Sequence, residues 1–197
     1  DLTRPEVVEE LFRIHRPDYV VHTAARVGGI GRNLNSAVRQ YEDNILMNTN
    51  VIREARRYNV EKLLAFGSVC AFPEGEIKAW EEDSLHNGPP FPAHRTYAYT
   101  KRMLDIHIDA CRNDGYNFGT VVPTNIFGEN DNYNLENGHV LPCLIHKGYL
   151  AKKNNSALEV WGDGTPRRDF IYAKDIAVIV QEFLDKIGIM PRSCILR

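Results

Sequence analysis

The sequence lacks the features of a membrane protein, a domain stabilised by a bound metal, or a nucleic-acid-binding protein. No stretch without a charged residue reaches the roughly eighteen residues that a membrane-spanning helix needs. The 24 basic and 26 acidic residues nearly balance, so no excess charge directs the chain to nucleic acid or an anionic membrane. Its four cysteines form no C-x-x-C pair, which argues against a zinc knuckle or a dithiol redox motif. We therefore expect a cytoplasmic protein with reduced thiols, no bound metal, and no membrane or nucleic-acid partner.

The apolar content is sufficient for a buried core, and its pattern alternates between helix and strand. Apolar residues make up 43% of the 197 positions and charged residues 25%, which suits one domain, or one domain and part of a second. Helical periodicity covers residues 5–15, 36–58, 97–113, 139–152 and 174–186. Short apolar runs predict strands at residues 18–23, 61–67, 118–122, 158–161 and 169–172, with another strand beginning at 193–196.

Strands that alternate with helices imply βαβ crossovers and a parallel sheet covered on both faces. We predict an α/β fold, a partial doubly wound sheet of the Rossmann type followed by the beginning of a smaller substrate-binding domain. Residues 1–130 would form the remainder of a dinucleotide-binding domain. Residues 131–197 would form part of the substrate-binding region, interleaved with the last elements of the sheet.

A glycine-rich turn of the G-x-G-x-x-G type, which opens a doubly wound dinucleotide-binding fold, is absent. The GGIG stretch at residues 28–31 follows a predicted strand but lacks the spacing. Asp1 and Leu2 stand where the third strand of such a fold would end, and the sequence starts without Met. We expect the first βαβ unit to lie upstream in a longer protein.

Two long irregular stretches, residues 71–95 and 123–138, follow the carboxyl ends of predicted strands. Open α/β sheets bind their ligands at that edge. A long loop in a compact domain is usually functional or disordered, and the position of these two favours a functional role.

Tyr97 and Lys101 are four residues apart, which places them on one face of a predicted helix. An ammonium beside a phenol favours the phenolate, so we expect Lys101 to lower the pKa of Tyr97. The spacing alone is weak, because Tyr and Lys are common on helix surfaces. Tyr99 is two residues from Lys101 and is expected to face away.

Three further residues sharpen this hypothesis. Ser68 ends a predicted strand, where its hydroxyl could bind a substrate carbonyl, although serine at such a place is more often a turn former. Cys70 and His139 could act as general base and general acid on one ring. Considered alone, Cys70 is more simply interpreted as a small buried residue, and His139 is more simply interpreted as an ordinary residue at a helix N-terminus.

The sequence resembles a known family over nearly its whole length. The segments that carry the resemblance are VVHTAARVGGI, GSVCAFP, HNGPP, YAYTKRMLD, VVPTNIFGENDNYNLENGHVLPCLIHK and ALEVWGDGTPRRDFIY. Ser68, Tyr97 and Lys101 match the triad of the extended short-chain dehydrogenase/reductases. Cys70, His139 and the long PTN…GHVLP block narrow the resemblance to the GDP-L-fucose synthases within that group.

The resemblance implies a two-step reaction on GDP-4-keto-6-deoxy-mannose with NADPH. Tyr97 would donate a proton to the C4 oxygen, Lys101 would hold the cofactor ribose and lower the pKa of the phenol, and Ser68 would bind the ketone oxygen. Cys70 and His139 would carry the epimerisations at C3 and C5, whose protons the ketone acidifies.

Binding residues are implied in the same way. The cofactor NADP would contact Asp1, Leu2, Ala24, Phe66, Gly67, Val69, Pro123, Thr124, Asn125 and Ile126. The GDP-sugar would be held by Lys147, Trp161 and Arg168, with the two cations suited to its diphosphate. The helices at 36–58 and 97–113 commonly form a four-helix dimer interface in this superfamily, so we expect a homodimer.

Some positions depart from the family pattern. Val69 replaces a second Ser that is often found there, and Lys147 stands where some members have Arg, which loses the bidentate fork. Two alternatives stay open. A sugar-nucleotide 4-epimerase or 4,6-dehydratase would share Tyr97 and Lys101 without requiring Cys70 and His139. A non-catalytic module that binds a nucleotide sugar or forms oligomers would fit a shortened chain.

Overall fold

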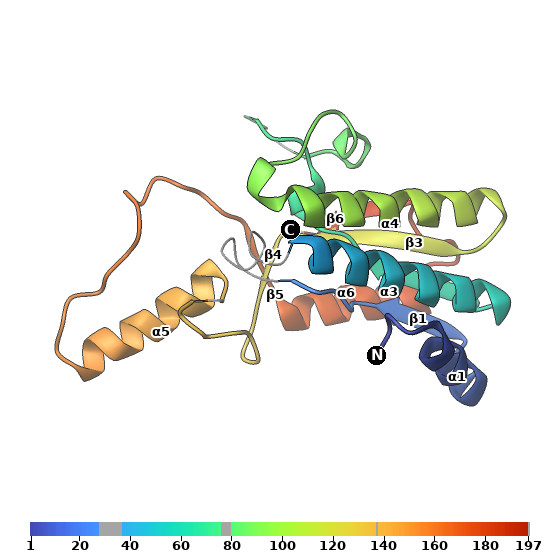
Figure 1. Cartoon of the computed structure of the whole chain (residues 1–197), viewed down its shortest axis with the longest axis horizontal. Coiled ribbons are helices and arrows are strands. Elements are labelled where there is room, and N and C mark those ends of the chain that lie inside the picture. The colour runs from blue at the N-terminus through green and yellow to red at the C-terminus, as the bar shows by residue number, and fades with distance from the viewer. Residues whose placement is uncertain (28–36, 76–79, 137, 197) are drawn as a thin grey trace.

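The computed structural model describes residues 1–27, 37–75, 80–136 and 138–196, and a four-stranded sheet lies at its centre (Figure 1). The strands occur in the order β1-β2-β3-β6, and all three pairings are parallel. Their bounds are β1 (Tyr19–His22), β2 (Lys62–Phe66), β3 (Phe118–Pro123) and β6 (Ser193–Leu196). Parallel neighbours need crossover connections, and the helices supply them.

One core cluster combines residues of β2 and β3 with three helices. These helices are α1 (Pro5–His15), α3 (Ala37–Arg57) and α4 (Arg95–Asn113). Leu63 and Ala65 of β2 pack in this cluster with Ile52 of α3 and with Leu104 and Ile108 of α4, and all five are at most 1% exposed. The apolar faces of the helices at i, i+3 and i+4 spacing are therefore buried against the sheet.

The opposite face of the sheet is covered by α6 (Ala173–Asp185). Its residues Ile176, Val180 and Phe183 pack in a second cluster with Leu64 and Phe66 of β2. Successive residues of a strand point to opposite faces, and both faces of β2 are covered. This double burial explains why β2 is a continuous apolar run rather than an alternating one.

A long excursion between β2 and α4 carries three short 3₁₀ turns, Val69–Ala71, Glu82–Ser84 and Pro92–His94. Two contacts to α4 hold its described parts in place. The buried Nε of Arg102 donates to the Ala71 carbonyl at 2.7 Å, and His86 Nε2 lies 3.1 Å from the buried carboxylate of Asp105. The excursion therefore lies over the N-terminal half of α4.

The chain leaves the sheet between β4 (Asn125–Phe127) and β5 (Phe170–Tyr172), which pair in parallel as a separate two-stranded sheet. Between them it forms α5 (Val140–Lys153) and returns as a segment without helix or strand, residues 154–169. We call residues 128–136 and 138–169 the arm, and the rest of the described chain the body. In Figure 1, α5 projects away from the sheet of the body.

The predicted α/β fold with a doubly covered parallel sheet is confirmed. All five predicted helices are present, and the strand at 193–196 pairs with β3. The strand predicted at 158–161 is wrong, because this segment is exposed and pairs with no strand of the described chain. Strand β4, in contrast, lies in a stretch that was expected to be irregular. The GGIG stretch lies outside the described residues.

None of the helices in the described ranges combines the length and hydropathy of a membrane span.

Candidate active site

Three strand ends bring expected site residues to one edge of the sheet. The loop after β1 contains Ala24, β2 ends at Phe66 and leads into Gly67 and Ser68, and β3 ends at Pro123. Since these strands are parallel and paired in sequence order, their carboxyl ends lie side by side. This is the edge at which open α/β sheets bind ligands.

Ser68 positions Cys70 through a short turn. The Ser68 backbone is extended, and its Oγ accepts a hydrogen bond from the Cys70 backbone N–H at 3.2 Å. This bond caps the 3₁₀ turn Val69–Ala71, as a serine cap does at a helix start. The Ser68 hydroxyl is also close enough to the phenol of Tyr97 to lower its pKa. The structure therefore brings together three of the predicted catalytic residues.

Helix α4 supplies Tyr97 and Lys101, one turn apart. Lys101 is 4% exposed, and its Nζ donates to the carbonyl of Phe66 at 2.6 Å. The same Nζ lies 5.8 Å from the centroid of the Tyr97 ring. Tyr99 contacts the guanidinium of Arg102 instead, with its centroid 5.5 Å away. The hydrogen bond to Phe66 fixes the lysine to the end of β2.

The electrostatics of this pair differ from the expectation. Desolvation by the surrounding protein raises the pKa of Tyr97, the nearby Cys70 raises it further, and the hydrogen bond with Ser68 lowers it. Burial lowers the pKa of Lys101 to about 8. The expected lowering of the phenol pKa by Lys101 is therefore wrong for this structure, because the ammonium is bound to Phe66 and is itself desolvated. A phenol with a raised pKa remains protonated at neutral pH, which suits a proton donor.

The Cys70 thiol is also protonated at neutral pH. Burial raises its pKa, whereas the hydrogen bond with Ser68 and the positive charge of Arg168 lower it. Arg168 belongs to the exposed end of the arm. The arm thus returns a cation whose positive charge acts on the thiol, and this charge favours the thiolate that a general base requires.

The expected cofactor-binding positions at the end of β3 are anchored by backbone contacts. Thr124 N–H donates to the Leu196 carbonyl at 3.0 Å, and Asn125 donates from both its backbone and its side chain to the Asp169 carbonyl, at 3.1 and 2.8 Å. Ile126 is 40% exposed. The Oγ1 of Thr124 is buried and has no hydrogen-bond partner, so a polar group of a ligand could satisfy it.

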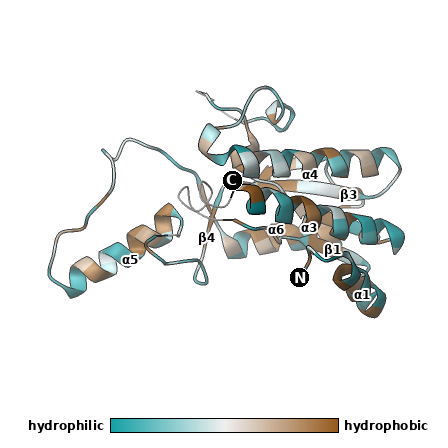
Figure 2. Ribbon diagram, in the orientation of Figure 1, coloured by the Kyte–Doolittle hydropathy of each residue, from teal (hydrophilic) through white to brown (hydrophobic). Residues whose placement is uncertain are grey.

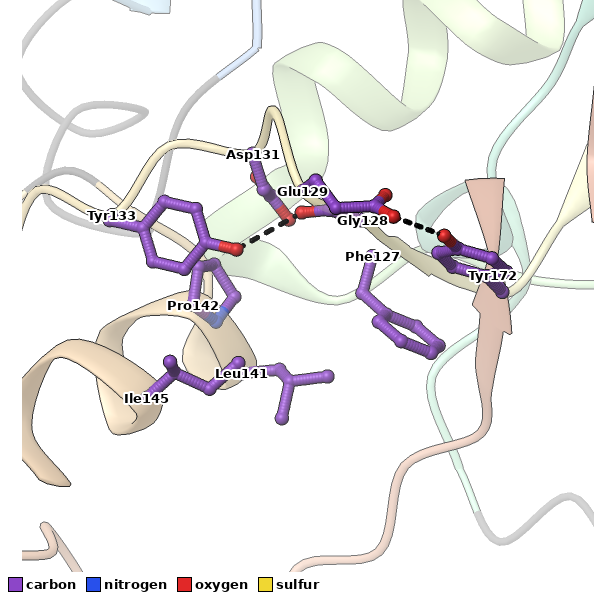
Figure 3. Close-up of a pocket in the computed structure, with 9 residues that line it drawn as sticks. All are labelled: Phe127, Gly128, Glu129, Asp131, Tyr133, Leu141, Pro142, Ile145 and Tyr172. Carbon is purple, nitrogen blue, oxygen red and sulfur yellow. Dashed lines mark hydrogen bonds between the residues drawn. The ribbon is translucent and has the colours of Figure 1, made fainter. Parts of the chain in front are cut away.

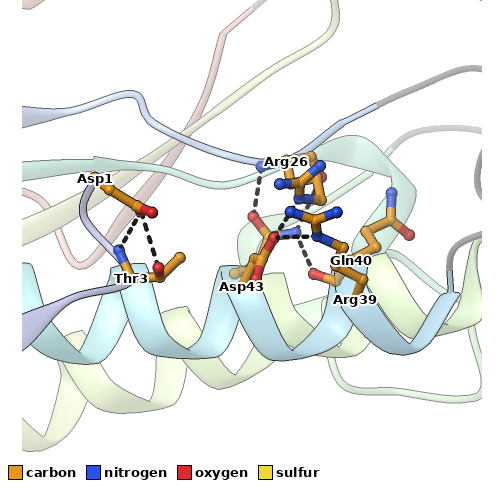
Figure 4. Close-up of polar contacts among 7 residues, drawn as sticks. Asp1, Thr3, Arg26, Arg39, Gln40 and Asp43 are labelled. Carbon is orange, nitrogen blue, oxygen red and sulfur yellow. Dashed lines mark hydrogen bonds and ion pairs between the residues drawn. The ribbon is translucent and has the colours of Figure 1, made fainter.

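Three other expected positions, Ala24, Leu2 and Asp1, lie on segments beside α3. The segment that contains Ala24 is fixed by Asn44, which accepts from the Arg26 N–H at 2.8 Å and donates to the Arg26 carbonyl at 3.0 Å. Arg26 also forms an ion pair with Asp43 (Figure 4). The Leu2 carbonyl accepts from Asn50 at 3.0 Å, next to Asp1.

The remaining predicted residues lie on the arm. Lys147 Nζ stacks 4.1 Å from the centroid of the Trp161 ring, so these two are brought together, and Trp161 is 75% exposed. His139 is exposed at the N-terminal cap position of α5 and does not line the cavity beside Cys70. The structure therefore does not bring His139 together with the thiol.

That cavity measures about 320 Å³, and an imidazole that no motif in the sequence indicates lies in its wall. Cys70 and His94 both line it, together with Val69, Phe72, Pro73, Glu74, Gly75, Trp80 and Phe91. His94 directly precedes α4 and stands three residues before Tyr97. No spacing motif marks such a residue, and only its place just upstream of Tyr97 could have signalled it.

A second cavity of about 270 Å³ lies where the arm joins the body, between Tyr172 of β5 and Leu141 and Ile145 of α5 (Figure 3). Glu129 lines it and accepts hydrogen bonds from Tyr172 Oη at 2.5 Å and Lys174 Nζ at 2.9 Å. These bonds lower the pKa of Glu129 to about 2. The carboxylate therefore ties the base of the arm to β5 and α6.

In the described part of the chain, no group of three or more His, Cys, Asp or Glu residues is arranged to hold a metal ion. All four cysteines are free thiols.

The chain is similar to known proteins over most of its length. Residues 1–189 match the model of the NAD dependent epimerase/dehydratase family. The chain is 44% identical over 179 residues to a GDP-L-fucose synthase of Dictyostelium discoideum, covering 90% of this chain and 56% of that protein. A GDP-L-fucose synthase of Sinorhizobium fredii is 40% identical over 177 residues, with 89% and 56% covered.

Among solved structures, a GDP-L-fucose synthetase from Naegleria fowleri bound to NADP superposes with a TM-score of 0.87 at 36% identity. That match covers 99% of this chain and 64% of the other. The chain thus spans a little over half the length of the curated relatives it matches. The family match over most of its length, together with the Ser68, Tyr97 and Lys101 cluster, shows that the chain belongs to the NAD dependent epimerase/dehydratase family.

Proposed function

We propose that the protein is a GDP-L-fucose synthase. It would convert GDP-4-keto-6-deoxy-D-mannose to GDP-L-fucose by 3,5-epimerisation followed by NADPH-dependent reduction of the 4-keto group. The observation that carries the proposal is the Ser68, Cys70, Tyr97 and Lys101 cluster at the carboxyl edge of the sheet. The similarity to GDP-L-fucose synthases supports the substrate class.

NADP fits this edge and, when bound, would supply the hydride. Lys101 would hold its ribose, because the ammonium has three donors and uses one of them on Phe66. The unpartnered hydroxyl of Thr124 and the residues around it would contact the nicotinamide side. The similar NADP-bound structure supports the choice of cofactor.

The reduction needs a proton donor at the ketone oxygen. Tyr97 would give its phenolic proton to the C4 oxygen as hydride reaches C4, and Ser68 would hold that oxygen by a hydrogen bond. The raised pKa of Tyr97 keeps the proton in place before the reaction. Lys101, close to the ring, would then stabilise the phenolate that forms.

The epimerisation needs a base and an acid beside C3 and C5. The Cys70 thiolate would remove a proton to form an enolate conjugated with the C4 ketone, and His139 would return a proton to the opposite face. Arg168 would raise the thiolate fraction by its charge. This assignment requires the N-terminus of α5 to approach the thiol when substrate binds.

A homodimer and a cytoplasmic location complete the proposal. Helices α3 and α4 pack side by side and leave large apolar side chains exposed, among them Tyr41 and Leu46 on α3 and Met103 and Ile106 on α4. Exposed apolar residues gathered on two neighbouring helices suit an interface between copies. Free thiols suit a reducing compartment.

The leading alternative is a 4-epimerase or 4,6-dehydratase, which would use the same triad. It would not need Cys70, so proton exchange at C3 and C5 discriminates between the two. A non-catalytic module would bind a GDP-sugar without oxidising NADPH.

The test uses the protein expressed in its full natural length. Incubation with GDP-4-keto-6-deoxy-mannose and NADPH in D₂O should lower the absorbance at 340 nm. The product should be GDP-L-fucose with deuterium at C3 and C5. Loss of absorbance without this deuterium would favour a simple 4-reductase, and no change at all would contradict the proposal.

A further inference from the structure

Arg102 places a buried positive charge beside the turn that contains Cys70. It follows Lys101 on α4 and is 4% exposed. Its Nε donates to the Ala71 carbonyl at 2.7 Å, and its guanidinium lies over the Tyr99 ring, 5.5 Å from the centroid. Nη2 is buried and has no hydrogen-bond partner in the part of the chain that the structure describes. The guanidinium is therefore only partly satisfied.

Stability alone explains such a side chain poorly. Desolvation of a charge is costly, and an apolar side chain of similar volume at a buried ionic position is often neutral or stabilising. A buried N–H without a partner adds a further cost and calls for an explanation. The contact that Arg102 does make is with Ala71, which ends the 3₁₀ turn and directly follows Cys70. An apolar side chain at position 102 could not replace this contact.

The turn is fixed at both of its ends. At the start, the Ser68 Oγ accepts from the Cys70 N–H at 3.2 Å, and the Ser68 carbonyl accepts from the Ala71 N–H at 3.0 Å. At the end, the Ala71 carbonyl accepts from Arg102. A single 3₁₀ turn has poor hydrogen-bond geometry of its own, so contacts from outside decide where it lies. Cys70 lies between these contacts and lines the cavity of about 320 Å³.

Helix α4 holds this segment at two neighbouring positions. Lys101 binds the Phe66 carbonyl before the turn, and Arg102 binds the Ala71 carbonyl at its end. The same helix carries Tyr97. The separation of the phenol from the thiol is therefore set by α4, through two backbone carbonyls.

We propose that Arg102 is a positioning residue for the epimerisation: its hydrogen bond to Ala71 holds the Cys70 thiol within reach of C3 and C5 of the sugar. The proposal rests on the function proposed above, which makes Cys70 the base. Arg102 touches neither substrate nor cofactor and acts only through the turn. Loss of the hydrogen bond should therefore slow proton removal and leave the groups that reduce the ketone in place.

The test separates the hydrogen bond from the bulk of the side chain, in the full-length protein. Gln carries an N–H group the same number of bonds from the backbone as Arg Nε, whereas Met carries a methyl group there. With GDP-4-keto-6-deoxy-mannose in D₂O, Arg102→Met should lower the rate of deuterium incorporation at C3 and C5 about tenfold, because a small misplacement of a reacting group is costly. NADPH oxidation should change by less than about threefold, since Tyr97 and Lys101 stay in place. Arg102→Gln should restore the deuterium rate to within about threefold of the unmodified enzyme.

Arg112 provides the matched control on the same helix. It lies near the C-terminal end of α4, and its Nη1 donates to the carbonyls of Phe118 and Met190, at 2.7 and 2.6 Å. Arg112→Met therefore also removes an arginine that binds backbone carbonyls, but neither carbonyl belongs to the turn. The ratio of deuterium incorporation to NADPH oxidation should fall in Arg102→Met and stay unchanged in Arg112→Met. A general loss of stability would not move this ratio.

An unchanged ratio in Arg102→Met would overturn the inference, whether both rates stay normal or fall together. An equal fall of the ratio in Arg102→Met and Arg102→Gln would overturn it as well, because the donor would then not matter. If Arg102→Met does not fold, Arg102→Ala carries the same test, because it opens the Ala71 carbonyl to water.

The same assay distinguishes the two proposals. An unmodified enzyme that neither consumes NADPH nor incorporates deuterium would refute the proposed function, and with it the role of Arg102. An enzyme that performs both steps and keeps its ratio in Arg102→Met would refute the role of Arg102 alone.

Discussion

The body and the arm differ in how many of their side chains are buried by packing within the described chain. Leu63, Leu64 and Phe118 in the sheet of the body are fully buried. On the arm, residues 152–169 are all exposed, and only Pro142 is buried in α5. Figure 2 shows hydrophobic residues on α5, and Val140, Ile145 and Tyr149 are each more than half exposed. The body is therefore determined by its own packing, whereas packing within the described chain covers little of the arm.

This difference separates two kinds of functional residue. Ser68, Tyr97 and Lys101 lie on the body, held by a capped turn and a bond to the end of β2. Lys147 and Trp161, which are proposed to hold the GDP-sugar, lie on the arm. Under the proposed function, the reduction would thus be preorganised on the body, whereas substrate binding and the return of a proton by His139 would depend on where the arm lies. Variants of Ser68, Tyr97 and Lys101 should therefore change kcat, and variants of Lys147 and Trp161 should change KM.

The largest effect is expected for Tyr97→Phe in the full-length protein. Removal of the phenolic proton should lower kcat for NADPH oxidation by roughly 10²–10⁴-fold with little change in KM. The matched control is Tyr99→Phe on the same helix, whose ring contacts Arg102 instead and whose activity should be near normal. Equal losses in the two variants would contradict the assignment of Tyr97.

Stability should follow the same division. Leu64→Ala removes a fully buried side chain from β2 and should lower the free energy of unfolding by about 2–5 kcal/mol. Leu158→Ala on the arm removes a side chain that is 48% exposed and should change it by less than about 0.5 kcal/mol. Urea denaturation measures both. A large effect of Leu158→Ala would show that the arm is packed in solution.

The approach of the arm to the site can be tested through the thiol. Arg168 lowers the pKa of Cys70, so Arg168→Gln should raise it. Alkylation of Cys70, followed across pH by mass spectrometry of its peptide, should then shift to higher pH. Arg167→Gln is the matched control, because Arg167 is not among the groups that shift this pKa. Identical profiles for the two variants would place Arg168 away from the thiol.

The smallest effect concerns the pH dependence of stability. Lys101 has a pKa of about 8 when folded, against the ordinary 10.5, so the unfolded chain holds more protons between these values. Its contribution to stability therefore rises with pH from about 8 to 10.5. The raised pKa of Tyr97 changes stability in the opposite direction, so that stability falls as the pH rises, but only above about pH 10. Between pH 8 and 10, Lys101→Met should lack the rise that the unmodified protein shows in urea denaturation. A rise of equal size in Lys101→Met would contradict the low pKa.

Much of the body could be predicted from the sequence, because its elements obey local rules. The apolar run at β2 and the helical spacing around Tyr97 reflect side chains that are buried within the body. The segment at 158–161 has the same apolar character, yet no described strand pairs with it, so periodicity alone was misleading. Strand β4 is three residues long, and its partner β5 lies more than forty residues away, so no local pattern could indicate it.

The site was partly predictable for a related reason. Spacing places Tyr97 and Lys101 together, but it cannot show that the lysine is bound to Phe66 or how strongly both groups are desolvated. For these two reasons, the prediction that the pKa of Tyr97 is lowered was wrong. His94 enters the cavity through the fold of the excursion, which no motif in the sequence describes.

The most direct test of the account is the separation of the two steps by Cys70→Ser. With GDP-4-keto-6-deoxy-mannose in D₂O, this variant of the full-length protein should lose deuterium exchange at C3 and C5 by about 10²-fold or more. It should still transfer hydride to the unepimerised ketone, because Tyr97 and Lys101 are intact. Cys194→Ser is the control and should retain both steps. Undiminished exchange in Cys70→Ser would contradict the account, since the thiol would then not be the base.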